Sequence, residues 1–283
     1  MEQRAAELQA RLATVAGFGD LVNAMRGIAA ARAQRARGLI DGANTYARTV
    51  AQAMAQVLAL LPEDEAEERH RIADQPPLYL LLGAEQGFNG GYTEQLLATL
   101  PGPLPGAHPL RLLVGGAQAE RMARARGLTL EGSAPLVAHA EAVLACSEHL
   151  HALLLQALAR RQAPSVELIH GELVGANQFR IRQQRLLPLD LQPLRSAGRP
   201  RPLVHEDPAR LLEGLSSEYV SAMLAQAVLH SHAAENLARL QAMAAAHENI
   251  AHMTDTLQAD ERRLRQEAIT AEVVELAAGL RNL

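Results

Sequence analysis

The chain has 283 residues, 48% of them hydrophobic but only 2% aromatic, and its net charge is −4. This length allows a substantial core, and the Ala- and Leu-rich composition favours helices over a β-sandwich. The mildly acidic balance argues against a nucleic-acid binder, and the single Cys146 excludes an internal disulfide.

All 14 prolines lie between Pro62 and Pro208, which leaves two long proline-free flanks. Proline inside a helix costs about 3 kcal/mol, so this placement predicts a helix, then a globular part, then a second helix. We therefore divide the chain into an N-terminal coiled-coil helix (1–61), a central α/β domain with its linkers (62–207) and a C-terminal coiled-coil helix (208–283).

The first flank repeats apolar residues at helical spacing, from Leu8 and Leu12 to Leu61, and it carries 7 Arg against 4 acidic residues. The central segment predicts buried strands at 77–83 and 110–116 and helices at 92–100, 117–126 and 137–161. Two more strands, at 166–174 and 179–187, pair around the turn at 175–178. The linkers are the acidic run at 63–68 and residues 195–208.

The last flank begins with Asp207, a good N-cap, and Pro208, which suits the first helical position. Its apolar spacing persists to Leu280, and its 6 Arg and 10 acidic residues give it a charge opposite to that of the first flank. A helix this long needs a partner helix, and the first flank is the natural one. Residual apolar surface on the pair predicts a rod enclosed by other subunits.

The expected fold is thus α/β with long helices: an antiparallel coiled coil of the N- and C-terminal helices plus a central Rossmann-like α/β domain. Alternation of strands and helices predicts a small, largely parallel sheet with an antiparallel edge.

Candidate chemical sites in the chain are weak. The loop at 83–91 follows a strand, as a dinucleotide fingerprint does, but its glycines are not in G-x-G-x-x-G order, so a tight turn is favoured. His247 and His252 are five residues apart, about 140° around a helix, and cannot hold one metal. Cys146, near His149 and His151, is interpreted as structural rather than nucleophilic. We expect no catalytic residue, no cofactor and no metal.

The C-terminal motif resembles the signature of ATP synthase gamma subunits; it reads Arg265-Gln266-Glu267-Ala268-Ile269-Thr270-Ala271-Glu272, followed by Glu275 and Gly279. Upstream positions that match the same family pattern are Glu235, Arg239, Met243, Ala246 and Asn249. Residues 24–32 and the loop at 83–92 resemble the family's N-terminal helix and glycine-rich turn. Departures such as Glu267, where the family usually has Ala, suggest a divergent bacterial branch.

The resemblance implies a non-catalytic central-stalk rotor subunit of an F-type ATP synthase, which couples transmembrane ion flow to rotary ATP synthesis or hydrolysis. Its partners would be the hexameric ring of alpha and beta subunits, the epsilon subunit and the membrane rotor c-ring. Its location would be peripheral, on the cytoplasmic face of the bacterial inner membrane. The implied rotor–stator contact residues are Arg265, Gln266, Thr270, Glu272, Met25 and Arg32.

Two other interpretations remain open at this point. An enzyme with a degenerate nucleotide-binding α/β domain and a helical dimerisation arm is supported by the loop at 83–91. A free-standing coiled-coil adaptor would leave the C-terminal motif unexplained.

Overall fold

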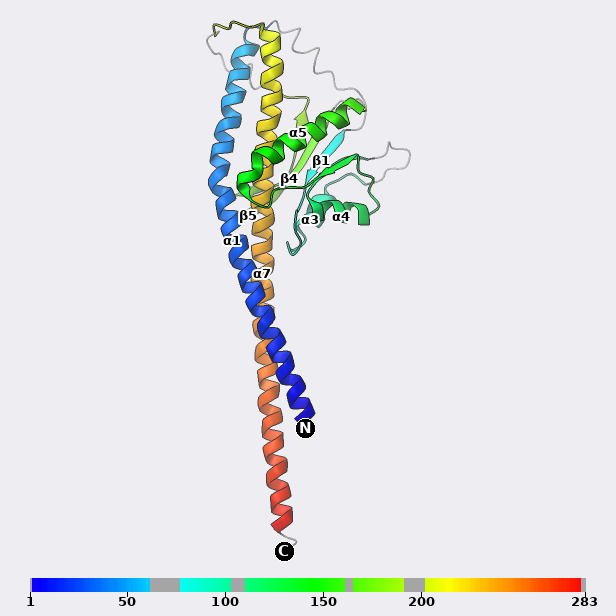
Figure 1. Cartoon of the computed structure of the whole chain (residues 1–283), viewed down its shortest axis with the longest axis vertical. Coiled ribbons are helices and arrows are strands. Elements are labelled where there is room, and N and C mark those ends of the chain that lie inside the picture. Colours follow the sequence, from blue (N-terminus) through cyan, green and yellow to red (C-terminus); the bar gives the residue numbers. More distant parts are fainter. Residues whose placement is uncertain (1, 62–76, 103–109, 161–164, 191–201, 281–283) are drawn as a thin grey trace. The chain divides into compact units, whose positions relative to one another are not determined.

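The computed structural model describes residues 2–61, 77–102, 110–160, 165–190 and 202–280 (Figure 1). The acidic run at 63–68 and residues 195–201 of the predicted linker at 195–208 lie outside these residues. The contacts divide the chain into two compact units: a rod unit, Met1–Ile28 with Leu240–Leu283, and an α/β unit, Ala29–Arg239. The long helices α1 (Glu2–Leu58) and α7 (Pro208–Leu280) contribute to both units.

One five-stranded sheet, in the order β3-β2-β1-β4-β5, forms the centre of the α/β unit. Its strands are β1 (Leu78–Leu82), β2 (Arg111–Gly115), β3 (Gly132–Ala134), β4 (Val166–Val174) and β5 (Gln178–Leu187). All neighbouring pairs are parallel except β4 and β5, which are antiparallel. The apolar sequence of β1 suits a strand covered on both faces. This arrangement confirms the predicted fold class, including the antiparallel edge.

Helices cover both faces of the sheet. Helices α3 (Tyr92–Ala98) and α4 (Ala117–Ala125) pack against the face that carries Leu81 and Leu112. Helix α5 (Val143–Arg160), with part of α1 and α7, packs against the face that carries Leu80 and Leu168. The segment Ala140–Arg160, which includes α5, is long and apolar enough to resemble a membrane-spanning helix by length and composition alone, and 28% of its apolar window is buried.

Two details differ from the sequence prediction. The helix predicted at 137–161 begins only at Val143, because residues Ala140–Ala142 form a separate 3₁₀ turn, η1. Strand β3 was not predicted, because Gly132-Ser133-Ala134 has neither apolar alternation nor β-branched residues. The other central elements fall within two residues of their predicted bounds.

In the α/β unit α1 and α7 run antiparallel and are tied by polar contacts. Gln226 Nε2 donates to Asn44 Oδ1 at 2.5 Å, and the Tyr46 hydroxyl donates to Glu218. Met54 and Val228 belong to the shared apolar core. In this unit α7 is therefore part of the core rather than an appended helix.

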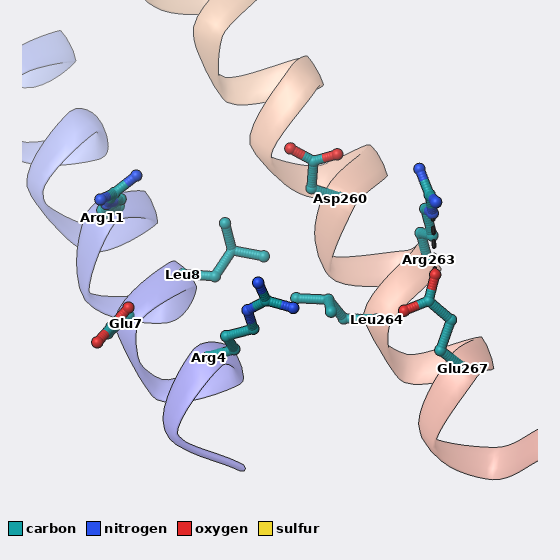
Figure 2. A pocket seen from close by; sticks show the side chains of 8 residues that line it. All are labelled: Arg4, Glu7, Leu8, Arg11, Asp260, Arg263, Leu264 and Glu267. Carbon is teal, nitrogen blue, oxygen red and sulfur yellow. Dashed lines mark hydrogen bonds and ion pairs between the residues drawn. The ribbon is translucent and has the colours of Figure 1, made fainter. Parts of the chain in front are cut away.

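In the rod unit the two helices again run antiparallel and leave grooves between them. Leu8 and Leu264 point toward each other, and Arg4 reaches toward α7 in a groove whose other lining residues are charged (Figure 2). A second groove is mostly apolar and is lined by residues that include Phe18, Ile250 and Met253. The rod unit therefore pairs its helices loosely and keeps apolar surface open to solvent.

Gly116 supports a testable prediction on the packing of the strand ends. Its φ is +108°, and an added Cβ would lie 2.5 Å from the Ala84 carbonyl oxygen, which accepts hydrogen bonds from the start of α4. Gly116→Ala should therefore lower the free energy of unfolding by about 2–4 kcal/mol. Gly42, a helical glycine with nothing within 4 Å, is the control; Gly42→Ala should raise that free energy by about 0.5–1 kcal/mol. Chemical denaturation measures both, and equal effects of the two variants would contradict the packing described.

Candidate functional site

The candidate ligand site is the carboxyl edge of the sheet between β1 and β4. Successive strands from β1 to β3 run in one direction across the sheet, and β4 lies on the other side of β1. Sheets of this kind bind ligands in the crevice where the strand order reverses. Here α7 lies at that edge: Ser231 Oγ donates to the Leu82 carbonyl at the end of β1, at 3.0 Å. On β4, the Leu173 N–H donates to His230 Nδ1 at 3.2 Å.

Glu235 of α7 accepts two backbone hydrogen bonds from the loop after β1. The backbone N–H groups of Glu85 and Gln86, in the loop after β1, donate to the two carboxylate oxygens of Glu235 at 3.1 and 3.2 Å. Glu235 is only 3% exposed. In phosphate-binding loops such N–H groups hold the ligand, but here a carboxylate of the chain already accepts their hydrogen bonds.

Arg239, one helical turn further along α7, neutralises Glu235 and holds the same loop by its carbonyls. Its guanidinium lies 2.5 Å from a Glu235 oxygen and donates to the carbonyls of Gly87 and Gln86, each at 3.2 Å. It also donates to Asn236 Oδ1 at 3.0 Å. A buried charged pair is stable only when its remaining hydrogen-bonding groups are satisfied, and this pair meets that condition.

A second carboxylate, that of Glu85, accepts two further backbone hydrogen bonds. Glu85 Oε2 accepts hydrogen bonds from the Ala117 N–H at the start of α4, at 3.0 Å, and from the Leu136 N–H, at 2.8 Å. The glycine loop is therefore held by the chain's own acidic side chains, and the interpretation as a nucleotide-binding enzyme loses its structural support.

Three histidines are buried around the same edge. Burial lowers the pKa of His170 to about 4 and that of His232 to about 4, and it also lowers the pKa of His230. The rings of His170 and His230 lie 6.3 Å apart, between β4 and α7. Nearby on β4, Glu172 is paired with Arg180 and Arg182, which hold its pKa below the usual value although burial opposes them. Burial between β4 and α7 therefore favours the neutral form of these histidines.

The rotor–stator residues implied by the resemblance fall in two places. Arg265, Gln266, Thr270 and Glu272 are exposed on α7 in the rod unit, and Arg265 pairs with Glu261 at 3.3 Å. Met25 is half-buried in the rod unit. Arg32 lies instead in the α/β unit, where it donates to Gln86 Oε1 at 3.3 Å, beside the loop that Glu235 holds.

Cys146 is half-buried, and its Sγ lies 3.7 Å from the Pro135 carbonyl oxygen. Burial raises the pKa of its thiol to about 11, so the reactive thiolate is disfavoured. His151 does not pair with it but contacts Ser221 Oγ at 2.7 Å. The residues that organise this site, Glu235 and Arg239, were noticed in the sequence only as positions matching a family pattern.

Fold and site together define the class: a long-helix protein with a Rossmann-like domain whose ligand crevice holds one of the protein's own helices. The family model described as ATP synthase matches residues 4–283, and the chain belongs to this family. This confirms the resemblance found in the C-terminal motif.

The relatives carry the same name. The ATP synthase gamma chain of Heliobacterium modesticaldum is 24% identical over 287 residues, which cover 96% of this chain and 97% of that one. That of Acidithiobacillus ferrooxidans is 28% identical over 293 residues, covering 97% and 98%. Among solved structures, the rotor of the Euglena gracilis mitochondrial ATP synthase shares the fold with a TM-score of 0.67 at 15% identity, covering 95% of this chain and 100% of that one. The Tetrahymena thermophila central stalk and c-ring structure matches with a TM-score of 0.56 at 18% identity, covering 80% and 99%.

The buried histidines predict a specific pH dependence. Because the folded protein holds the pKa of His170 near 4, below its ordinary value of 6.5, the unfolded chain binds more protons between these values. The stabilisation of the folded state by neutral His170 is present above pH 6.5 and is lost as the pH falls toward 4. For one such group, the free energy of unfolding decreases by about 2 kcal/mol between pH 7.5 and 5. Glu172, whose pKa is lowered from 4.5, loses its contribution only at lower pH.

Thermal unfolding between pH 7.5 and 5 measures this effect. His170→Gln should flatten the decline of the melting midpoint with falling pH, whereas the same substitution at exposed His149 should leave the decline unchanged. Parallel curves for the wild type and His170→Gln would contradict the assignment.

Proposed function

We propose that this chain is the central-stalk rotor subunit of an F-type ATP synthase, coupling ion flow across a membrane to rotary ATP synthesis or hydrolysis. The observation that carries the proposal is the C-terminal part of α7. Every side chain from 265 to 274 is exposed, including Ile269 (55%), Val273 (58%) and Val274 (61%). In Figure 1 this part of α7 continues alone past the N-terminus of α1.

A helix that has no packing partner and exposes apolar side chains is only marginally stable in water. Isolated helices are marginal, and most helical stability in proteins comes from packing of an apolar face. Further apolar side chains, Phe18 (56% exposed), Leu21 (55%) and Met253 (53%), extend the open surface along the rod unit. Such a surface indicates a rod enclosed by other subunits. The ring of alpha and beta subunits in an F-type ATP synthase would provide that enclosure.

The proposed rotor–stator residues suit a shaft that presents different sides in turn. Arg265 and Glu272 are seven residues apart and share one side of α7, whereas Gln266 and Thr270, four apart, share another. Exposed polar groups of this kind can form charge-assisted hydrogen bonds with a ring subunit at one rotary position and release them at the next.

The proposed rotor function also assigns a role to each segment of the chain. We infer that the shaft is formed by residues 1–61 and 208–283, while the central domain at 62–207 contacts the epsilon subunit and the membrane rotor c-ring. The chain itself is non-catalytic, which the filled ligand crevice supports. It works on the cytoplasmic face of a bacterial inner membrane, held there only through the complex.

The first test is an affinity purification of the tagged chain from native membranes solubilised in detergent. We expect two abundant phosphate-loop ATPase subunits in molar excess over this chain, because a single shaft serves a ring of alternating subunits. Recovery of the chain alone, or only with itself, would contradict the proposal and favour the coiled-coil adaptor.

Arg265 offers a test of the contact residues in the assembled complex. Arg265→Ala should lower ATP hydrolysis roughly tenfold, since a charge-assisted hydrogen bond contributes about 1.5 kcal/mol. Arg263 is the matched control: it forms a similar exposed ion pair, with Glu267 at 3.0 Å (Figure 2), and it belongs to the lining of the groove between α1 and α7. Arg263→Ala should leave the rate nearly unchanged, and equal losses would count against a specific role for Arg265.

A further inference from the structure

We propose that Glu235 and Arg239 form a latch that fixes α7 to the loop after β1 and passes load between the α/β domain and the shaft helix. The role in load transfer rests on the proposed rotor function. The latch itself rests on contacts that lie within the α/β unit.

The latch holds three consecutive residues by both kinds of backbone group. Glu235 accepts from the N–H groups of Glu85 and Gln86, while Arg239 donates to the carbonyls of Gln86 and Gly87. Glu235 and Arg239 are four residues apart, so they project from the same side of α7. Rotation or sliding of α7 against the loop would break these bonds together and leave a buried ion pair unsatisfied, which is strongly unfavourable.

Apolar contacts elsewhere on α7 cannot resist such motion as well. The helix meets the domain core through side chains such as Leu224, Val228, Ala234 and Ala238. Apolar burial is non-directional, so it holds the helix against the domain without by itself specifying one rotation of the helix. Directional hydrogen bonds between α7 and backbone groups add a restraint on its rotation: those of Ser231 and His230 with β1 and β4, and those of Glu235 and Arg239 with the loop after β1.

The loop is anchored on its far side, so load can continue into the domain. The Glu85 carboxylate binds the N–H groups of Ala117 and Leu136, which follow β2 and β3 respectively. Asn89 Nδ2 donates to the Gln86 carbonyl at 3.1 Å and braces the loop internally. One polar path therefore leads from α7 through the loop to the ends of two further strands.

Chemical rescue tests the latch directly. Glu235→Ala removes a CH₂–carboxylate group, which has the size and shape of an acetate ion. The buried site keeps the N–H donors of Glu85 and Gln86 and the Arg239 guanidinium. In the full chain, potassium acetate should raise the melting midpoint of this variant by about 2–4 °C over potassium chloride at equal ionic strength. The matched control is Glu120→Ala, which breaks an exposed i,i+4 pair with Arg124 on α4; acetate should give it no such rise.

The functional arm uses the complex reconstituted in vesicles. Glu235→Ala should lower ATP-driven ion pumping per ATP hydrolysed, and acetate should restore much of this ratio, whereas Glu120→Ala should behave as wild type. If Glu235→Ala does not fold, Glu235→Gln keeps the shape and one acceptor oxygen, and should give a smaller loss of the ratio.

The outcomes separate the two proposals. An assembled Glu235 variant with an unchanged pumping ratio, or with no response to acetate, would overturn the latch. A wild-type chain that fails to support pumping in the complex would contradict the proposed function instead, and acetate-dependent melting of the free chain would still report on the latch.

Discussion

The structure depends on the filling of one crevice. In a doubly wound sheet the carboxyl edge between β1 and β4 is where a ligand would bind, and here Ser231, His230 and Glu235 of α7 take that place. Because a helix occupies the crevice, the glycine loop at 83–91 has a structural role: it binds that helix. Burial then disfavours the charged form of the neighbouring histidines, and α7 becomes part of the domain core. The non-catalytic character that we propose follows from the same substitution of a helix for a ligand.

Two parts of α7, the stretch within the α/β unit and the C-terminal part in the rod unit, meet opposite physical requirements. Within the α/β unit its side chains are almost entirely buried from Leu224 to Arg239, and its polar residues there are hydrogen-bonded in several directions. In the rod unit the same helix is exposed from Arg265 to Val274. A shaft needs this contrast, because it must be fixed where it joins its base and free of permanent contacts where it turns against its surroundings.

Most of the fold could be predicted from sequence because it follows from local signals. Proline placement marked the long helices, and apolar strands ending in glycine marked β1 and β2. The missed strand β3 has no such signal and exists because it pairs with β2. The role of Glu235 was equally hidden: its partners Glu85 and Gln86 are 150 and 149 residues away in sequence, and only tertiary structure brings them together. The contact residues on the rod stay predictions, since their partners belong to other chains.

The open end of α7 also has a consequence for how the cell must make this protein. A copy produced without its partners leaves Ile269, Val273 and Val274 in water, together with the apolar groove around Phe18. Surfaces of this kind promote self-association. Because of these exposed apolar residues, the cell must synthesise this chain in proportion to the other subunits or remove surplus copies promptly.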